Sequence, residues 1–112
     1  TLSKTIIDDV IRGKIGFDGL LLTDDIDMEA LSGTVPGRSE RAIAAGCDLV
    51  LNCWAKMDDM AQIAERLPAL GDKGHKRLEG ALAVAEQAQE GGDKTDLLAQ
   101  RDEFLAMAEA AA

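Results

Sequence analysis

The spacing of the hydrophobic residues changes along the chain, and each spacing predicts an element. From residue 2 to residue 13 the apolar residues recur at helical intervals. Ser3 is the expected N-cap of this helix, and Gly13 is its expected C-terminal stop. The segments GLLLT (19–23) and CDLVLNC (47–53) are apolar runs too short for helices. They predict strands that are buried on both faces, as in a parallel sheet.

The segments around these two runs predict helices. Ile26 to Ser32 is expected to form a short helical turn, and a helix from about Arg38 to Ala45 is expected to end at Gly46. Because helices separate the two strands, the order predicts a right-handed crossover and a parallel pair. Three further amphipathic helices are expected to pack on the strands, at Met57–Leu67, Lys73–Gln89 and Thr95–Ala111, with breaks at Pro68–Gly71 and Gly91–Gly92. Two strands leave two open edges and are not a stable sheet alone, so something else must complete it.

Composition restricts the class of protein and its partners. The chain of 112 residues predicts one domain, and 46% hydrophobic residues suffice for a core. A net charge of −9 and an aromatic content of 3% argue against a nucleic-acid partner and an anionic membrane surface. No export signal or membrane-spanning run is visible, and Cys47 and Cys53 would lie about 20 Å apart on one strand, too far for a disulfide. We therefore expect a cytoplasmic protein with reduced thiols.

The candidate chemistry lies in GLLLTDDID, where an apolar run leads into three aspartates. Side chains at the carboxyl ends of parallel strands converge on binding and catalytic sites. Asp24 and Asp25 leave the strand in opposite directions, so one is expected to face a cavity while the other ties down the loop or caps the next helix. Asp27 falls where it would complement the dipole of the helical turn. Asp24, directly off the buried strand, is the candidate catalytic residue.

Three chemistries fit such a carboxylate. Asp25-Ile26-Asp27 is similar to the DxD motif of haloacid-dehalogenase-like phosphatases, but Met28 and Glu29 replace the usual Thr-rich or Gly-rich turn. A response-regulator receiver also has an acidic pair after its first strand, but Cys53 stands where its phosphoacceptor aspartate would be. The third chemistry is nucleophilic attack on a sugar, as in retaining glycoside hydrolysis. The residues alone leave sugars and phosphates both open.

A longer resemblance favours the sugar chemistry. The stretch TLSKTIIDDVIRGKIGFDGLLLTDDIDMEALSG and the following GRSERAIAAGCDLVLNC closely resemble the bacterial β-N-acetylhexosaminidases of glycoside hydrolase family 3, in their peptidoglycan-recycling branch. A second motif, R-x5-A-A-G-C-D-apolar, runs from Arg38 to Val50. The resemblance covers about residues 1 to 53. The family signature is filled by Gly16, Phe17, Asp18, Gly19, Thr23, Asp24, Asp25 and Met28.

The resemblance implies an α/β fold made of the last two βα units of a (β/α)8 TIM barrel, in residues 1–53, with a C-terminal helical tail in residues 54–112. It implies that Asp24 is the nucleophile that forms a glycosyl-enzyme intermediate. The implied substrates are muropeptides with terminal N-acetylglucosamine, and no metal or organic cofactor is implied. The family's acid/base histidine region has no counterpart here, so the chain resembles a C-terminal segment that is inactive alone.

Two departures from the family pattern lie beside the candidate nucleophile. Thr23 replaces the more usual serine and keeps the hydroxyl, while Asp27 replaces a common serine and adds negative charge. The competing hypothesis is a non-catalytic α/β interaction module that self-associates through its open strand edges.

Overall fold

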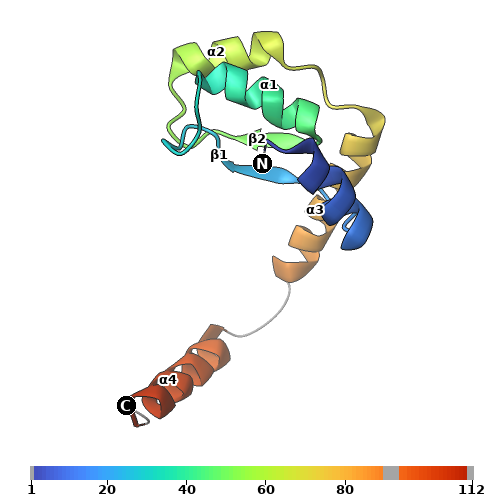
Figure 1. Cartoon of the computed structure of the whole chain (residues 1–112). Coiled ribbons are helices and arrows are strands. Elements are labelled where there is room, and N and C mark those ends of the chain that lie inside the picture. Colours follow the sequence, from blue (N-terminus) through green and yellow to red (C-terminus); the bar gives the residue numbers. More distant parts are fainter. Residues whose placement is uncertain (1, 90–93, 111–112) are drawn as a thin grey trace. The chain divides into compact units, whose positions relative to one another are not determined.

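The computed structural model describes residues 2–89 and 94–110, which form helices and one pair of strands (Figure 1). The chain divides into two compact units, residues 1–81 and residues 82–112. No helix in the described parts is long and apolar enough to cross a membrane. The elements, in chain order, are η1 (Ile6–Lys14), β1 (Leu22–Asp25), α1 (Val35–Ala45), β2 (Leu49–Leu51), α2 (Met57–Arg66), α3 (Asp72–Gln89) and α4 (Lys94–Ala110).

The two strands pair in parallel, which confirms the predicted crossover. Both are shorter than the predicted 19–23 and 47–53, and β1 lies further along the chain. Pairing starts at the carbonyl of Leu21, which accepts the N–H groups of Asp48 at 2.9 Å and Leu49 at 3.3 Å. Before this point the carbonyl of Gly19 is engaged by a side chain instead of a strand. The predicted runs therefore include the turns that lead into and out of a short ladder.

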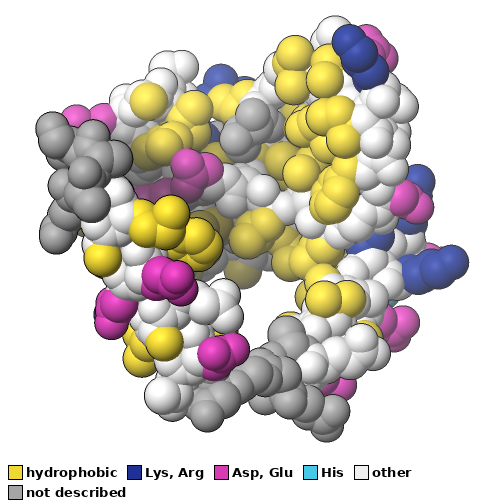
Figure 2. Space-filling model, turned by 90° about the horizontal axis from the view of Figure 1, so that it is seen from below, with side chains coloured by type: hydrophobic (Ala, Val, Ile, Leu, Met, Phe, Trp, Pro, Cys, Tyr) yellow, Lys and Arg dark blue, Asp and Glu magenta, His cyan; other side chains and the backbone are white. Residues whose placement is uncertain are grey.

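One face of the sheet is covered by helices and the other is open. α1 and α2 lie on the same side of the strands (Figure 1), and α1 packs against β2. Leu22 is 49% exposed and Leu51 is 38% exposed. The view from below shows hydrophobic side chains at the surface on the uncovered side (Figure 2). The prediction that both faces are buried is therefore wrong for these residues.

The first helix, η1, has the wide turns of a π-helix and runs past its predicted stop. The N–H of Ile15 bonds to the carbonyl of Val10, five residues back, at 2.8 Å. Gly13 lies inside this helix, and a Cβ there would be only 3.1 Å from the carbonyl oxygen of Asp8. Ser3 acts as predicted at the start, since its hydroxyl oxygen accepts the N–H of Ile6 at 3.3 Å.

The second predicted helix, α1, begins three residues earlier than expected and ends as expected. The Thr34 hydroxyl oxygen accepts the N–H of Gly37 at 3.3 Å, and Pro36 stands in the first turn. These are a capping residue and a proline at the positions that favour helix initiation. Gly46 ends the helix at φ 115°, where a Cβ would lie 3.0 Å from Cγ2 of Ile7.

The predicted helical turn between β1 and α1 is two separate turns and no helix. The N–H of Met28 bonds to the carbonyl of Asp25 at 3.4 Å, and the N–H of Leu31 bonds to the carbonyl of Met28 at 3.2 Å. The Arg38 guanidinium donates to the carbonyls of Ile26 and Met28, both at 3.1 Å. These two bonds tie the loop after β1 to α1.

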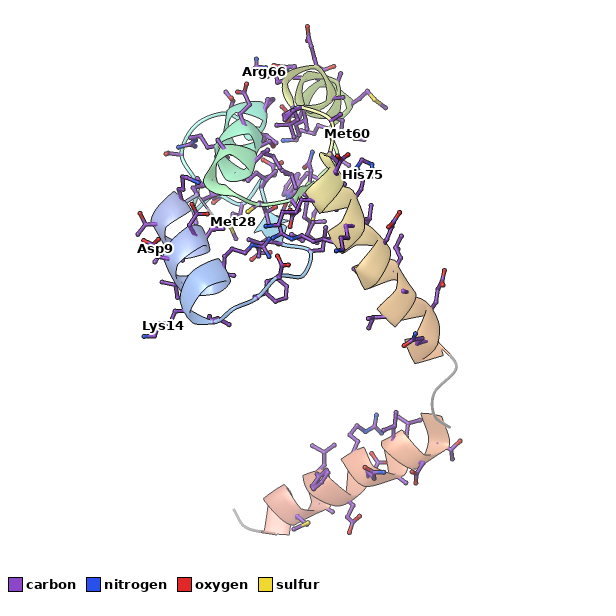
Figure 3. All side chains as sticks on the ribbon, turned by 90° about the vertical axis from the view of Figure 1, so that its right-hand side faces the viewer. Asp9, Lys14, Met28, Met60, Arg66 and His75 are labelled. Carbon is purple, nitrogen blue, oxygen red and sulfur yellow. The ribbon has the colours of Figure 1, made fainter. Side chains whose placement is uncertain are left out.

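A small core joins η1, the end of β1 and α1. Its buried side chains are those of Ile7, Ile26, Val35, Ala42, Ala45 and Cys47. Partly buried residues complete it, namely Leu2, Ile11, Leu21, Leu31, Val50 and Ile63. Charged side chains of η1 such as Asp9 and Lys14 point away from it (Figure 3).

The helices after the sheet have nearly the predicted bounds. α2 packs on α1 rather than directly on the strands, and Arg66 approaches Glu40 at 3.6 Å. α3 begins one residue before the predicted Lys73. α4 begins one residue before the predicted Thr95. Gly91, Gly92 and Ala111 lie outside the described residues.

The starts of the strands are held by one buried carboxylate, that of Asp48. It accepts hydrogen bonds from the N–H of Leu21 at 2.8 Å, from Arg12 at 2.9 Å and from Arg77 at 2.9 Å. Its side chain is 10% exposed, and those of the two arginines are 16% and 11% exposed. Burial raises the pKa of Asp48, but the Leu21 N–H and the guanidinium groups outweigh it and hold that pKa below the ordinary 3.8.

The Asp48→Asn substitution tests this carboxylate. We expect it to lower the free energy of unfolding at neutral pH by about 3 kcal/mol, because the nearly buried Arg12 loses its counter-charge and Arg77 keeps only the exposed Asp18. Folding lowers the pKa of Asp48 below its ordinary value of 3.8. The contribution of Asp48 to the free energy of unfolding is therefore complete above pH 3.8 and is lost as the pH falls through the pKa of the folded state. Urea unfolding from neutral to acid pH should therefore show the variant and the wild type converging in acid.

Asp8→Asn is the matched control, because Asp8 pairs with Lys4 at the surface, where the two side chains are 46% and 70% exposed. It should change the free energy of unfolding by no more than about 0.5 kcal/mol. Equal losses in the two variants would contradict the central role of Asp48.

Candidate functional site at the carboxyl ends of the strands

The ladder between the strands contains an irregularity between Leu22 and Asp25. Leu22 pairs with Leu49 and Asp25 pairs with Leu51, so β1 advances three residues while β2 advances two. An extra residue on one strand is the mark of a β-bulge, which redirects side chains and is common beside active sites. The bulge falls on Thr23 and Asp24.

Thr23 fills the gap that the bulge leaves in the ladder. Its side chain is 4% exposed, and its hydroxyl oxygen accepts the N–H of Leu51 at 2.9 Å. The ladder resumes with the N–H of Ile26, which bonds to the carbonyl of Leu51 at 2.8 Å. The hydroxyl that Thr23 shares with serine therefore has a structural task at this position.

Asp25 ties the ends of the two strands together. Its Oδ1 accepts the N–H of Cys53, beyond the end of β2, at 3.0 Å and the N–H of Asp27 at 3.2 Å. These two backbone hydrogen bonds hold the pKa of Asp25 below 3.8, although desolvation acts to raise it. The bond from the N–H of Cys53 has the larger effect. Desolvation and the nearby charges of Asp25 and Asp24 raise the pKa of the Cys53 thiol.

Asp27 is balanced by a cation from the segment after β2. The Nζ of Lys56 lies 3.7 Å from its carboxylate, and the Asp27 side chain is 15% exposed. The predicted dipole role of Asp27 is wrong because no helix forms at 26–32. The added negative charge is instead met by an ion pair that connects the two strand-end loops.

Asp24 differs from its two neighbours. It is exposed, and its carboxylate accepts the N–H of Asp25, the next residue, at 2.8 Å. Asp25 and Asp27, by contrast, bond to residues of the loop after β2. Asp25 ties down the loop, as expected of one of the pair. That the other carboxylate faces a cavity stays a prediction.

Two buried nitrogen atoms at this end of the sheet lack partners among the described residues. They are Nε of Arg38, whose guanidinium binds the loop after β1, and Nδ2 of Asn52, which follows β2. Buried donors are normally satisfied. Within the described part of the chain, unmet hydrogen-bonding capacity therefore gathers beside the candidate nucleophile.

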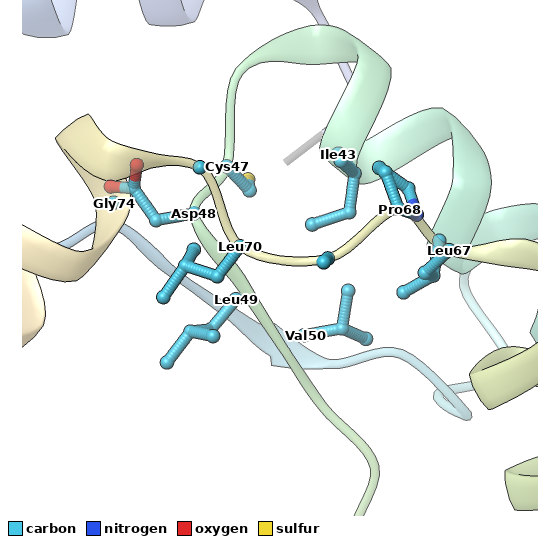
Figure 4. A pocket seen from close by; sticks show the side chains of 11 residues that line it. Ile43, Cys47, Asp48, Leu49, Val50, Leu67, Pro68, Leu70 and Gly74 are labelled. Carbon is cyan, nitrogen blue, oxygen red and sulfur yellow. The ribbon is translucent and has the colours of Figure 1, made fainter.

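The larger hollows do not coincide with the aspartates. A cavity of about 290 Å³ lies between α1, β2 and the segment before α3 (Figure 4). Its lining is mostly apolar, and the Asp48 oxygens at its edge are already bonded to Arg12 and Arg77. Burial raises the pKa of the Cys47 thiol that lines it, which keeps the thiol unreactive. This cavity is a packing space and not the candidate site.

Sequence reasoning located Asp24 and Asp25 but missed several contacts. Lys56, Asn52 and Trp54 belong to the loop after β2, and their relation to the aspartates depends on strand pairing. No disulfide joins Cys47 and Cys53, as predicted. The described residues contain no cluster of three or more histidine, cysteine, aspartate or glutamate side chains able to hold a metal ion.

The Thr23→Val substitution tests the bulge. Valine has nearly the shape of threonine but cannot accept the N–H of Leu51, so we expect the free energy of unfolding to fall by about 1–3 kcal/mol. Amide hydrogen exchange at Leu51 should accelerate together with this loss.

Thr23→Ser is the matched control because it retains the hydroxyl. It should preserve the slow exchange at Leu51 and remove only a buried methyl group, at a cost of about 1 kcal/mol. Fast exchange at Leu51 in the serine variant would show that the hydroxyl is not the acceptor.

Comparison with known proteins places this geometry in a family. Residues 1–83 match the sequence model described as the glycosyl hydrolase family 3 N-terminal domain. The match extends about thirty residues beyond the predicted limit at residue 53, through α2 and into α3. The prediction of little similarity after residue 53 is thus wrong for residues 54–83. Arg77, which lies in this stretch, binds Asp48.

Similar proteins carry the name beta-hexosaminidase. One from Chromobacterium violaceum is 40% identical over 79 residues, which cover 69% of this chain and 22% of that protein. One from Tolumonas auensis is 43% identical over 53 residues, 46% of this chain and 16% of that protein. One from Bordetella pertussis is 36% identical over 67 residues, 58% of this chain and 18% of that protein. The chain spans about a fifth of the length of these relatives.

Proposed function

This chain belongs to glycosyl hydrolase family 3, and we propose that it is the C-terminal segment of the barrel of a retaining β-N-acetylhexosaminidase, with Asp24 as the nucleophile. The family's N-terminal domain is of the TIM-barrel type. In this proposal β1 and β2 are the last two barrel strands, within residues 1–53, and residues 54–112 form a helical tail. The parallel pairing and the connecting helix support this placement.

The observation that carries the proposal is the different use of the three aspartates. Asp25 is bound to two backbone N–H groups and Asp27 to Lys56, so both stabilise the strand-end loops. Asp24 is exposed at the bulge, and its carboxylate accepts a hydrogen bond from the N–H of the next residue, Asp25. A nucleophile needs a rigid backbone and an accessible carboxylate, and Asp24 combines the two.

The proposed reaction has two steps. An Asp24 oxygen bonds to the anomeric carbon of a terminal N-acetylhexosamine while the glycosidic bond breaks, and the departing oxygen takes a proton from a general acid. Water, deprotonated by the same group, then attacks the anomeric carbon and releases Asp24. The proposed general acid lies outside these 112 residues, since the sequence has no segment similar to the family's acid/base histidine region.

The proposed substrates are cell-wall muropeptides that carry terminal N-acetylglucosamine, cleaved in the cytoplasm during peptidoglycan recycling. The name of the relatives, beta-hexosaminidase, supports hexosamine substrates in general. The proposal requires no metal or organic cofactor, because the carboxylate itself forms the covalent intermediate. It also implies that the isolated chain is inactive, since the leaving oxygen cannot be protonated.

A chimera tests the nucleophile. The segment of the Chromobacterium violaceum protein that aligns with this chain is replaced by the corresponding residues of this chain, and hydrolysis of an aryl N-acetyl-β-glucosaminide is measured. We expect the chimera to be active and Asp24→Asn to lower kcat/KM at least about a thousandfold, equivalent to about 4 kcal/mol of transition-state stabilisation.

Two controls accompany the chimera. Asp8→Asn, which removes a charge from the exposed surface pair with Lys4, should leave the activity of the chimera unchanged, while the 112-residue chain alone should show no turnover. An active chimera that keeps its activity with Asp24→Asn would refute the assignment. Turnover by the isolated chain would refute the need for an external general acid.

A second candidate function is self-association as a non-catalytic module, favoured by the uncovered sheet face. Leu22 and Leu51 are exposed on strands whose outer edges have no strand neighbour among the described residues. Size-exclusion chromatography with light scattering should then give twice the chain's mass, and Leu22→Lys should give the monomer. Leu82→Lys, at a residue that is 55% exposed on α3, is the control and should remain a dimer. A folded wild-type monomer at every concentration would contradict this function.

A further inference from the structure

The loop after β2 presents the chain's sole tryptophan to solvent. Trp54 is 71% exposed, although an indole ring is among the largest apolar surfaces that a protein can bury. It follows Cys53, whose N–H is bound by Asp25. The exposed ring therefore stands at the same end of the sheet as Asp24, beyond the neighbouring strand.

The backbone on both sides of Trp54 is fixed. Cys53 is held by Asp25 at 3.0 Å, and the Oδ1 of Asn52 accepts the N–H of Ala55 at 3.4 Å. Ala55 has φ 47°, the left-handed region that is uncommon for a residue with a side chain. Such strain persists where the surrounding structure imposes it, and it is concentrated at functional sites. The ring is thus presented on a constrained turn and not on a free loop.

Polar groups are arranged beside the ring. The Nζ of Lys56 lies 5.2 Å from the centre of the Trp54 ring, within the range of a cation–π contact, and 3.7 Å from the carboxylate of Asp27. The ammonium can cover one face of the indole only, and the lysine side chain is itself 59% exposed. The flat apolar surface of the Trp54 ring therefore lies beside a hydrogen-bond donor, the Lys56 ammonium, which in turn lies beside an acceptor, the Asp27 carboxylate.

A sugar ring matches this combination. One side of a pyranose presents C–H groups that pack against an aromatic face, while its hydroxyl groups take up charged donors and acceptors at the edge. Resting on the proposed glycosidase function, we infer that Trp54, Lys56 and Asp27 form a carbohydrate-binding subsite, with Trp54 as the stacking surface for a pyranose ring of the saccharide that Asp24 attacks.

The experiment uses the full 112-residue chain, in which one indole N–H signal reports on Trp54 alone. A ¹⁵N-labelled sample is titrated with N,N′-diacetylchitobiose into the tens-of-millimolar range and followed by ¹H–¹⁵N spectra. We expect a saturating shift of the indole signal with a millimolar Kd, and shifts at the amides of residues 52–56. Lys56→Gln should weaken binding several-fold, whereas Lys76→Gln, which removes the same charge from an exposed position on α3, should not change it.

Other outcomes overturn the inference. An indole signal that does not shift, that shifts without saturation, or that shifts equally with glycerol at matched hydroxyl concentration shows that Trp54 does not bind the sugar. The result is separable from the chimera assay. If the indole signal does not shift while the chimera is active and depends on Asp24, the subsite is refuted and the proposed function stands. If the indole signal shifts to saturation while the chimera keeps its activity with Asp24→Asn, the nucleophile is refuted and the sugar-binding site stands.

Discussion

The structure of residues 2–81 depends on the nearly buried carboxylate of Asp48. It receives the N–H of Leu21 from the approach to β1, Arg12 from η1 and Arg77 from α3. Because it stands directly before β2, these bonds set where the two strands meet. Arg12 and Arg77 also bind backbone carbonyls of the loop between η1 and β1, at Phe17, Asp18 and Gly19. Once this end is fixed, the register carries Asp24 and Asp25 to their places at the other end.

The two ends of the sheet are built for different purposes. At the start of the strands the charges are paired and nearly buried, which is the pattern expected of a stabilising face. At the carboxyl ends the described residues show an exposed carboxylate, an exposed tryptophan and two buried nitrogens without partners. Evolution tolerates such unmet groups where function requires them. The proposed function requires this division, because the chemistry of barrel enzymes occupies the carboxyl ends of the strands.

How far the sequence predicts this structure depends on the range of the interactions concerned. Local pattern and short motifs predict the order of the two strands, the helix end at Gly46 and the Ser3 cap. They also predict that Asp24 lies towards the carboxyl end of the first strand. The bulge at Thr23, the π-helical turns of η1 and the short ladder do not, because each depends on how distant segments meet. Arg77 pairs with Asp18 across 59 residues, and no periodicity in the sequence indicates that contact. The open face at Leu22 was not predicted either, because an apolar run does not indicate which face of a strand will be covered by other elements.

The aspartates after β1 illustrate how one short stretch can serve structure and chemistry together. Asp25 is kept ionised by the N–H groups of Cys53 and Asp27, so its hold on the end of β2 is released only below the ordinary aspartate pKa of 3.8. Around neutral pH the hydrogen bond between Asp25 and the N–H of Cys53 is therefore retained. Lys56 meets the charge of Asp27, and this ion pair again links the loops after β1 and β2. With both neighbours committed to the scaffold, Asp24 is the carboxylate of this stretch that remains available for a reaction.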